Sequence, residues 1–505
     1  MCEMALAQVT GAVIAGMTGT VVTVEVDVAQ GLPTVGLVGL ADTSIGEARQ
    51  RARCAVGNTG LRWPLGRVTI GLSPAHVRKH GTGLDLPIAI GVLAADDQID
   101  VDRGTSFVIV GELGLDGQVR SIPGAITVAC AAQQAGFDRI VVPADHVGEC
   151  SRVPNLDVVG VRSLEEAVGV VAGDHTGIRD SNPGNRRRVR TEPDLADVVD
   201  QLEGRRALEI AAAGRHSLAM IGSPGVGKTL LAERLPGILP DLSASESVDV
   251  MSIHALAGGT DEVTGQDARP PFQAPHHSSS PAALLGSVSG GSVRPGAVSL
   301  AHRGVLFLDE APEFPRNALE ALRQPMESGA VSLHRAGWSG DVPADFQLII
   351  AANPCPCGYR HAPRSLARHC DCPPTAVGSY ARRISGPLLD RIDLRIRLQP
   401  VIGAKRGEAS REVAARVIEA RERALHRWGS TNAMVGPSTL LETALESDAQ
   451  AIVDRYLETS GGMRSTQRLV KVAWTLADLG GSVRPGASHM REALELHQPL
   501  WDDAS

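Results

Sequence analysis

The sequence predicts an α/β protein built from several domains, and three observations support this fold class. The chain has 505 residues, too many for one compact core, so about two to four domains are expected. Strand-type and helix-forming segments alternate from Leu195 to about Leu398, as in a parallel sheet with flanking helices. Beyond that point the chain is mostly helical, with amphipathic segments at 407–429 and 466–481.

The first predicted domain, residues 1–172, has mixed α and β structure. Valines alternating with polar or small residues indicate a strand over 19–28, namely Val21, Val24, Val26 and Val28. Further strands are expected at 67–73, 106–114 and 139–144, and helices at 43–60 and 124–136. A segment rich in Gly, Pro, Asn and Arg then predicts an exposed linker at 173–193. The sheet domain would occupy 194–400, and a helical domain 401–505.

Composition and charge narrow the class of protein. The net charge of −8 gives the chain no overall excess of positive charge to attract nucleic acid, so any such contact needs a local basic patch. The linker's basic run is interpreted as solvated, with phosphate contact as the alternative (Arg186, Arg187, Arg188 and Arg190). No secretory signal is visible, and the apolar run at 86–95 is too short to span a bilayer. We therefore expect no membrane contact and a cytoplasmic location, where thiols stay reduced.

The stretch GSPGVGKT, residues 222–229, matches the phosphate-binding pattern G-x-x-x-x-G-K-[ST] in full. An apolar run precedes it and a helix-forming run follows, the context that this loop requires. Backbone N–H groups of such a loop wrap phosphates, and the following helix adds its positive end. We expect Lys228 to reach the β and γ phosphates of ATP and Thr229 to ligate Mg²⁺. The predicted nucleotide-binding set is Gly222, Ser223, Pro224, Gly225, Val226, Gly227, Lys228 and Thr229.

Two further motifs complete a hydrolytic site. Residues 305–308 are typical of a buried strand that ends in Asp309 and Glu310. We expect Asp309 to hold Mg²⁺ through water and Glu310 to polarise the attacking water. A second apolar strand ends at Asn353, which either orients the same water, caps an Asn-Pro turn, or does both.

Arg391 lies between two acidic residues after a Gly-Pro turn, in the stretch GPLLDRID. The spacing leaves two interpretations open. Arg391 is either part of a buried structural ion pair or a cation offered to the γ-phosphate held by a neighbouring subunit.

Four of the eight cysteines fall within residues 353–374, as two C-x-C pairs separated by twelve residues. Four thiolates suit tetrahedral Zn²⁺, which would be structural because no coordination position stays open. The ligands would be Cys355, Cys357, Cys370 and Cys372, with His361 and His369 as possible substitutes. Reduced surface thiols are the alternative. Because the phosphate loop follows a different strand, we expect it to bind nucleotide even without the zinc site.

Together these motifs resemble an AAA+ ATPase of the magnesium-chelatase-like clade. The phrases APHHSSS, LEALRQPMESGAVSLHRAG and AANPCPCG narrow the resemblance to the ComM/YifB family, over nearly the whole chain. The resemblance implies a P-loop AAA+ core and a C-terminal helical lid. It also implies that Arg391 is an arginine finger acting between subunits and that Arg464 is the sensor 2 arginine, with Arg468 as alternate. A hairpin at 328–346, with Arg335 near its tip, would face a central pore, and the assembly would be a homo-oligomeric ring, most simply a hexamer.

The N-terminal domain resembles the S5 domain 2-like fold of Lon-protease type. Gly83 stands where that resemblance places the nucleophilic serine, and Ile126 where it places the lysine. Without a nucleophile and an activating amine, the domain is expected to be non-catalytic, so the protein is not a protease.

The resemblance further implies an ATP-driven DNA motor, a helicase or branch-migration factor of recombination or transformation. Arginines on candidate pore or surface loops offer modest local support: Arg335, Arg360, Arg364 and Arg368. The alternative is the motor subunit of a magnesium chelatase, which drives metal insertion into a porphyrin. The Lon-type domain and the cysteine loop argue against that alternative. His276 and His277 receive no role from the sequence.

Overall fold

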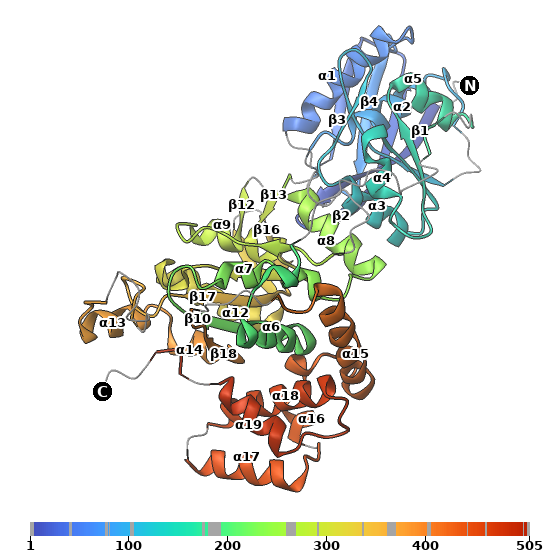
Figure 1. Ribbon diagram of the computed structural model, residues 1–505. Helices are drawn as coiled ribbons and strands as arrows, with labels where there is room; N and C mark the ends of the chain where they lie inside the picture. The colour runs from blue at the N-terminus through green and yellow to red at the C-terminus, as the bar shows by residue number, and fades with distance from the viewer. Residues whose placement is uncertain are drawn as a thin grey trace.

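The computed structural model describes residues 5–39, 43–75, 79, 81–101, 106–173, 177–179, 193–258, 269–289, 292–335, 338–360, 370–400, 406–441, 443–459, 462–497 and 499–501. Figure 1 shows an N-terminal α+β region, a central region around one sheet, and a C-terminal helical region, following each other along the molecule.

The N-terminal region begins with a four-stranded sheet of order β1-β2-β4-β3. Its strands are β1 (Ala5–Ala15), β2 (Thr18–Ala29), β3 (Thr34–Val38) and β4 (Arg67–Ser73). The core face of β2 is formed by Val22, Val24 and Val26, so Val21 lies on the other, less buried face. Helices α1 (Thr43–Asn58) and α2 (Asp85–Ala95) pack against each other beside this sheet.

A second, parallel sheet of order β5-β8-β9 completes the region. Its strands are β5 (Phe107–Ile109), β8 (Arg139–Pro143) and β9 (Asp157–Val161), accompanied by α3 (Ala125–Gln134), α4 (Val147–Cys150) and α5 (Leu164–Val171). The prediction of one strand over 106–114 was wrong. The chain leaves the sheet at Val110 and Gly111 and continues in a short ladder of β6 (Glu112–Leu113) with β7 (Val119–Arg120).

The central region is a five-stranded sheet of order β11-β14-β17-β10-β18, in which every neighbouring pair is parallel. Its strands are β10 (Leu218–Ile221), β11 (Phe272–Gln273), β14 (Val305–Leu308), β17 (Gln347–Ala352) and β18 (Leu394–Arg397). Every residue of β10, β14 and β17 is buried, as expected for a parallel sheet covered on both faces. The predicted parallel sheet is thus confirmed.

Short helices cover this sheet, and two hairpins project from it. The helices are α6 (Leu202–Gly214), α7 (Lys228–Ala232), α8 (Ala244–Leu256), α9 (Pro281–Leu285), α10 (Ala297–Leu300), α11 (Arg316–Ala321), α12 (Arg323–Ser328), α13 (Pro374–Ala381) and α14 (Gly386–Leu389). The expected hairpin is β15 (Ala330–Arg335) with β16 (Trp338–Pro343). A second hairpin, β12 (Gly286–Ser289) with β13 (Ser292–Pro295), was not predicted.

The N-terminal region touches both hairpins through the turn between β1 and β2. Gly16 forms a bridge with Ser292 of β13, and a Cβ on Gly16 would collide with the Trp338 indole of β16. Helix α3 also packs on α8, where Val248 and Met251 join the N-terminal core. Neither hairpin can therefore shift without disturbing this contact.

The C-terminal region is helical, as predicted: α15 (Ser410–Trp428), α16 (Pro437–Leu441), α17 (Ser447–Thr459), α18 (Met463–Leu479) and α19 (Ala487–Glu495). Helix α15 packs on α6 and α18 through a buried stripe at helical spacing (Val413, Val417, Ala420 and Ala424). Among the described helices, none is long and apolar enough to cross a bilayer.

After α19 the chain returns to the sheet. His497 forms a parallel bridge with Arg395 of β18, and the backbone N–H of Arg395 donates to Leu496 O (2.6 Å). Arg397 donates to Pro499 O (3.2 Å), and Leu500 is buried in a core cluster with Ile221 and Ile350. The described residues of this C-terminal tail, 496–497 and 499–501, thus lie beside the edge strand β18.

Candidate functional site

Parallel topology brings the predicted catalytic segments to one edge of the sheet. The phosphate loop follows β10, Asp309 follows β14, and Asn353 follows β17. The register pairs Ile221 with Ala352 and Leu308 with Ile350, so all three strands end at nearly the same level. Ligands of open parallel sheets bind outside these carboxyl ends.

The loop at 222–229 has a backbone that only glycine accommodates easily. Gly225 and Gly227 have φ angles of +82° and +95°, in the left-handed region. A Cβ on Gly222 would lie 2.8 Å from Val226 Cγ2 and 2.9 Å from Leu398 O. The loop is therefore a tight cradle ahead of α7, and its shape fits a phosphate chain.

The Lys228 ammonium is folded into this cradle. Its Nζ donates to Gly222 O (2.6 Å), Ser223 O (3.1 Å) and Asn353 Oδ1 (3.1 Å). Burial lowers the pKa of Lys228, while Asp309 and Glu310 act to raise it. The third contact places Asn353 within one hydrogen bond of the lysine, as expected of a residue that senses the same phosphate.

Thr229 and Asp309 form the expected oxygen pair for Mg²⁺. Thr229 Oγ1 donates to Asp309 Oδ2 (2.7 Å) across the gap between α7 and β14. A hydroxyl and a carboxylate suit Mg²⁺, which keeps several waters and takes few protein ligands. These two residues would hold the ion if it binds here.

Glu310 adopts a left-handed conformation, with φ of +50°, and its side chain is half exposed. Its Oε2 lies 3.3 Å from Nδ1 of His277, whose ring is tilted by 34° against that of His276 at 4.1 Å between centroids. His277 follows β11, the strand beside β14. Sequence reasoning missed this partner of Glu310, although the phrase APHHSSS already stood out.

Arg391 lies at the opposite edge of the same sheet. Its carbonyl accepts from Ser217 Oγ (2.8 Å), and both residues precede strands that pair Leu218 with Leu394. The guanidinium binds Glu327 and Pro387 O. The Glu327 side chain is 61% exposed and the Arg391 side chain 15% exposed, so this ion pair lies at the margin of the surface and is not fully buried. Arg391 thus faces away from the nucleotide edge of its own chain.

Both sensor 2 candidates lie on the first turns of α18, one exposed and one buried. Arg464 is exposed. Arg468 is buried close to Asp393 and Arg395, and burial lowers its pKa. The Arg468 guanidinium donates one hydrogen bond, from Nη2 to Ser465 Oγ (3.0 Å), and its Nε and Nη1 have no partner among the described residues. Arg468 therefore lies at the edge of the sheet that carries Arg391, and Arg464 lies one helical turn before it on α18.

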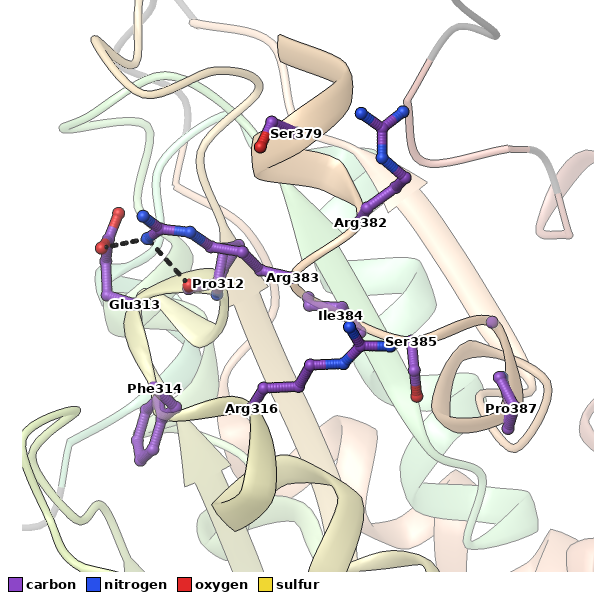
Figure 2. A pocket seen from close by; sticks show the side chains of 11 residues that line it. Pro312, Glu313, Phe314, Arg316, Ser379, Arg382, Arg383, Ile384, Ser385 and Pro387 are labelled. Atoms are coloured by element: carbon purple, nitrogen blue, oxygen red, sulfur yellow. Dashed lines mark hydrogen bonds and ion pairs between the residues drawn. The ribbon is translucent and has the colours of Figure 1, made fainter. Parts of the chain in front are cut away.

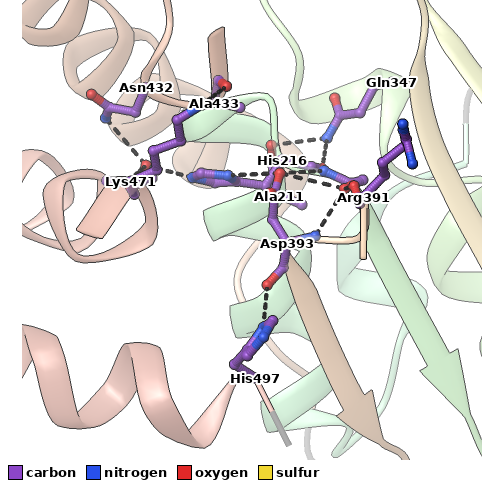
Figure 3. Close-up of polar contacts among 11 residues, drawn as sticks. Ala211, His216, Gln347, Arg391, Asp393, Asn432, Ala433, Lys471 and His497 are labelled. Atoms are coloured by element: carbon purple, nitrogen blue, oxygen red, sulfur yellow. Dashed lines mark hydrogen bonds and ion pairs between the residues drawn. The ribbon is translucent and has the colours of Figure 1, made fainter. Parts of the chain in front are cut away.

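A polar network holds the helical region against this edge (Figure 3). His216 contacts Asp393 Oδ2 through Nδ1 (3.2 Å) and Thr475 Oγ1 through Nε2 (2.7 Å). Burial acts to raise the pKa of Asp393, but the hydrogen bond from His216 and nearby positive charges lower it. Thr475 belongs to α18, so the network links the sheet to the helix that carries Arg464 and Arg468.

The four predicted metal ligands converge. The sulfur atoms of Cys355, Cys357, Cys370 and Cys372 lie within 4.8 Å of one another. Two pairs are at 3.3 Å and 3.6 Å, near the spacing of about 3.8 Å that Zn–S bonds of ~2.3 Å give in a tetrahedron. Burial raises the pKa of Cys357 to about 12 and also raises that of Cys370. Such a thiol cluster becomes fully ionised only around a cation, so the donor set fits zinc.

The cysteine loop and the phosphate loop follow different strands, β17 and β10, as expected, but the two loops lie against each other. Gly358 has a φ of +83°, and a Cβ there would lie 2.8 Å from Cδ and Cγ of Pro224. Arg360 lines a cavity of about 360 Å³ together with Ser223 and Trp501. In place of independent nucleotide binding, we therefore propose that the zinc site supports nucleotide binding through this contact.

Several other predicted residues can be placed. Ile126 is fully buried on α3, and Gly83 accepts a backbone hydrogen bond from Gly111, so neither position offers a nucleophile or an amine. Arg335 ends β15, next to the hairpin tip. The linker arginines lie outside the described residues, as do His361, Arg364, Arg368 and His369.

Comparison with known proteins gives the same picture over the whole chain. Family models match in series: "Subunit ChlI of Mg-chelatase" at 24–146, "Magnesium chelatase, subunit ChlI" at 194–406, and "Magnesium chelatase, subunit ChlI C-terminal" at 407–497. The chain is 44% identical to the protein Rv2897c of Mycobacterium tuberculosis, over 98% of this chain and 99% of the relative.

Two further relatives extend over almost all of this chain. YifB of Escherichia coli is 40% identical, over 95% of this chain and 94% of its own. The competence protein ComM of Haemophilus influenzae is 37% identical, over 97% of both chains. A shorter match to Lon protease 2 of Bacillus subtilis, 24% identical over 30% of each chain, agrees with a Lon-like N-terminal region. With an AAA+ parallel sheet, a Lon-like α+β region and a helical C-terminal region, the chain belongs to the magnesium-chelatase-like AAA+ family, alongside YifB and ComM.

Proposed function

We propose that this protein is a Mg²⁺-dependent ATPase. The observation that carries the proposal is the convergence of Lys228, Thr229, Asp309 and Asn353 at one edge of the parallel sheet, joined by hydrogen bonds of 2.7 and 3.1 Å. In this proposal Lys228 and the loop amides bind the phosphates, and Thr229 and Asp309 hold Mg²⁺. Glu310 accepts a proton from the attacking water, and Asn353 orients that water.

The active unit would be a ring of identical chains, most simply a hexamer. Arg391 lies at the edge of the sheet opposite the phosphate loop, so it cannot serve the nucleotide of its own subunit. Offered to a neighbour, it would supply positive charge to the γ-phosphate as an arginine finger. Arg464 or Arg468 would act at the same junction. In the single chain, the Arg391 guanidinium forms an ion pair with Glu327.

The substrate of the motor would be DNA, single-stranded or branched, in recombination or transformation. Support comes from ComM, a competence protein that matches this chain from end to end. The cysteine cluster would carry structural zinc and stiffen the segment between Asn353 and Arg391. None of the seven described cysteines forms a disulfide, which accords with a cytoplasmic location.

The test is an ATPase assay on purified protein with and without single-stranded and forked DNA, followed by strand separation on the fork. Stimulation by DNA and ATP-dependent unwinding are expected. The alternative, a motor subunit for metal insertion into a porphyrin, is favoured by the family descriptions that name magnesium chelatase. A rate of ATP turnover that is unchanged by DNA but rises when chelatase partner subunits are added would favour that alternative.

A further inference from the structure

A hollow of about 910 Å³ opens beside the segment that follows Glu310 (Figure 2). One wall is the single helical turn Ala311–Glu313 and the start of α11, and the other is the end of α13 and the start of α14. None of the groups assigned above to ATP, Mg²⁺ or zinc lines it.

Four ionisable residues line the hollow, three of them cationic (Arg316, Arg382 and Arg383) and one anionic (Glu313). Arg383 Nη1 donates to Glu313 Oε2 (2.7 Å) and Pro312 O (3.2 Å). The side chains of Arg316 and Arg382 are exposed and make no hydrogen bond or close ion pair with a described residue, although Glu320 is near enough to Arg316 to interact with it electrostatically. On a chain of net charge −8, this concave cluster is a local positive field that attracts anions.

The arrangement of the guanidinium groups indicates the kind of anion. In Figure 2, Arg316 extends toward Ile384 and Ser385, Arg383 turns to Glu313, and Arg382 points away from both. Each guanidinium is a rigid fork that matches phosphate oxygens. Groups spread along a groove suit successive phosphates of one strand better than a single small ion.

We propose that this arginine pocket binds the phosphate backbone of a nucleic-acid strand and reports its presence to the ATPase site. The inference rests on the proposed DNA-dependent function and adds a DNA contact outside the hairpin of β15 and β16.

Two short connections lead from the pocket to the catalytic residues. The backbone N–H of Glu313 donates to Glu310 O (2.7 Å), so a change at Glu313 reaches the residue that would polarise water. The Arg383 guanidinium lies 5.9 Å from the ring centroid of Tyr380, and the backbone of Asn353 is close enough to the Tyr380 hydroxyl to act on it electrostatically. A phosphate that binds Arg383 in place of Glu313 therefore perturbs the segments of Glu310 and Asn353. This links binding of the nucleic-acid strand to ATP hydrolysis.

The test is the double substitution Arg316→Gln/Arg382→Gln, which removes the two unpaired charges and leaves the Arg383–Glu313 pair intact. Affinity for a labelled single-stranded oligonucleotide is measured by fluorescence anisotropy at several salt concentrations. Loss of two phosphate contacts should flatten the plot of log affinity against log salt by about 1.4, at ~0.7 per contact. Stimulation of ATP turnover by DNA should fall, while basal turnover stays at the wild-type rate. Arg411→Gln, an exposed arginine on α15, is the matched control and should change neither quantity.

The outcomes separate this inference from the proposed function. A wild-type protein without DNA affinity would refute the DNA-motor function. Wild-type DNA binding with an unchanged salt slope in the double variant would overturn the pocket alone. Loss of ring assembly by the double variant in sedimentation, with DNA affinity retained, would also overturn it and assign the pocket to a second copy of the chain.

Discussion

The contact between the cysteine loop and the phosphate loop predicts that Gly358→Ala weakens ATP binding. Gly358 has a φ of +83°, and an alanine Cβ would lie 2.8 Å from two ring carbons of Pro224. The left-handed backbone costs alanine roughly 1–2 kcal/mol, and this strain falls on the cysteine loop itself. The collision adds about 1–3 kcal/mol, as overpacking does elsewhere, and displacing the phosphate loop is the way to relieve it.

If the phosphate loop must move to relieve the collision, about 1–3 kcal/mol is lost from the free energy of ATP binding. ATP affinity should then fall by about 5- to 150-fold, since each 1.4 kcal/mol is a factor of ten. The assay is a titration with a fluorescent ATP analogue in the presence of Mg²⁺. Gly429→Ala is the matched control, because Gly429 has a similar φ of +72° but open space around its Cβ. It should lower stability without changing ATP affinity. A Gly358→Ala protein with wild-type ATP affinity and intact metal content would refute the coupling of the two loops.

Four further substitutions test the roles proposed above. Lys228→Ala should abolish ATP binding in the same titration, since no other side chain in the loop supplies a cation to the phosphates; wild-type turnover would reject the phosphate-loop assignment. Glu310→Gln should bind ATP but turn it over about 10²–10⁴-fold more slowly, and failure to bind would mean a different role. Arg391→Ala should bind ATP without hydrolysing it, and mixing it with Lys228→Ala subunits should restore turnover; full activity of Arg391→Ala alone would make Arg391 a structural ion pair. Cys370→Ser should bring zinc below one ion per chain by elemental analysis and weaken ATP binding as Gly358→Ala does; wild-type protein without stoichiometric metal would defeat the zinc assignment.

The sequence predicted the central sheet well because its strands are uninterrupted apolar runs that end in polar motifs. Residues 305–308 and 347–352 form strands that end one residue before Asp309 and Asn353, and parallel pairing then brings those motifs together. The four cysteines also met as their spacing indicated.

The parts that escaped prediction depend on packing between distant segments. Helix α2 has the apolar sequence LPIAIGVLAA, buried on nearly every side, so it has no polar face to mark its period. The pairing of His277 with Glu310 depends on β11, a strand of only two residues beside β14. The contact of Gly358 with Pro224 follows from the path of a loop, which no local pattern in the sequence describes.

The C-terminal tail gives the helical region a further attachment to the sheet, besides the packing of α15 on α6 and the hydrogen bond of His216 to Thr475. The chain enters the helical region from the end of β18, and it returns to the same strand through the bridge of His497 to Arg395 and the burial of Leu500. Because the segment leaves and rejoins one strand, a displacement of β18 would act on the helical region from both of its ends. The arginines of α18 would then move together with the edge of the sheet rather than independently of it.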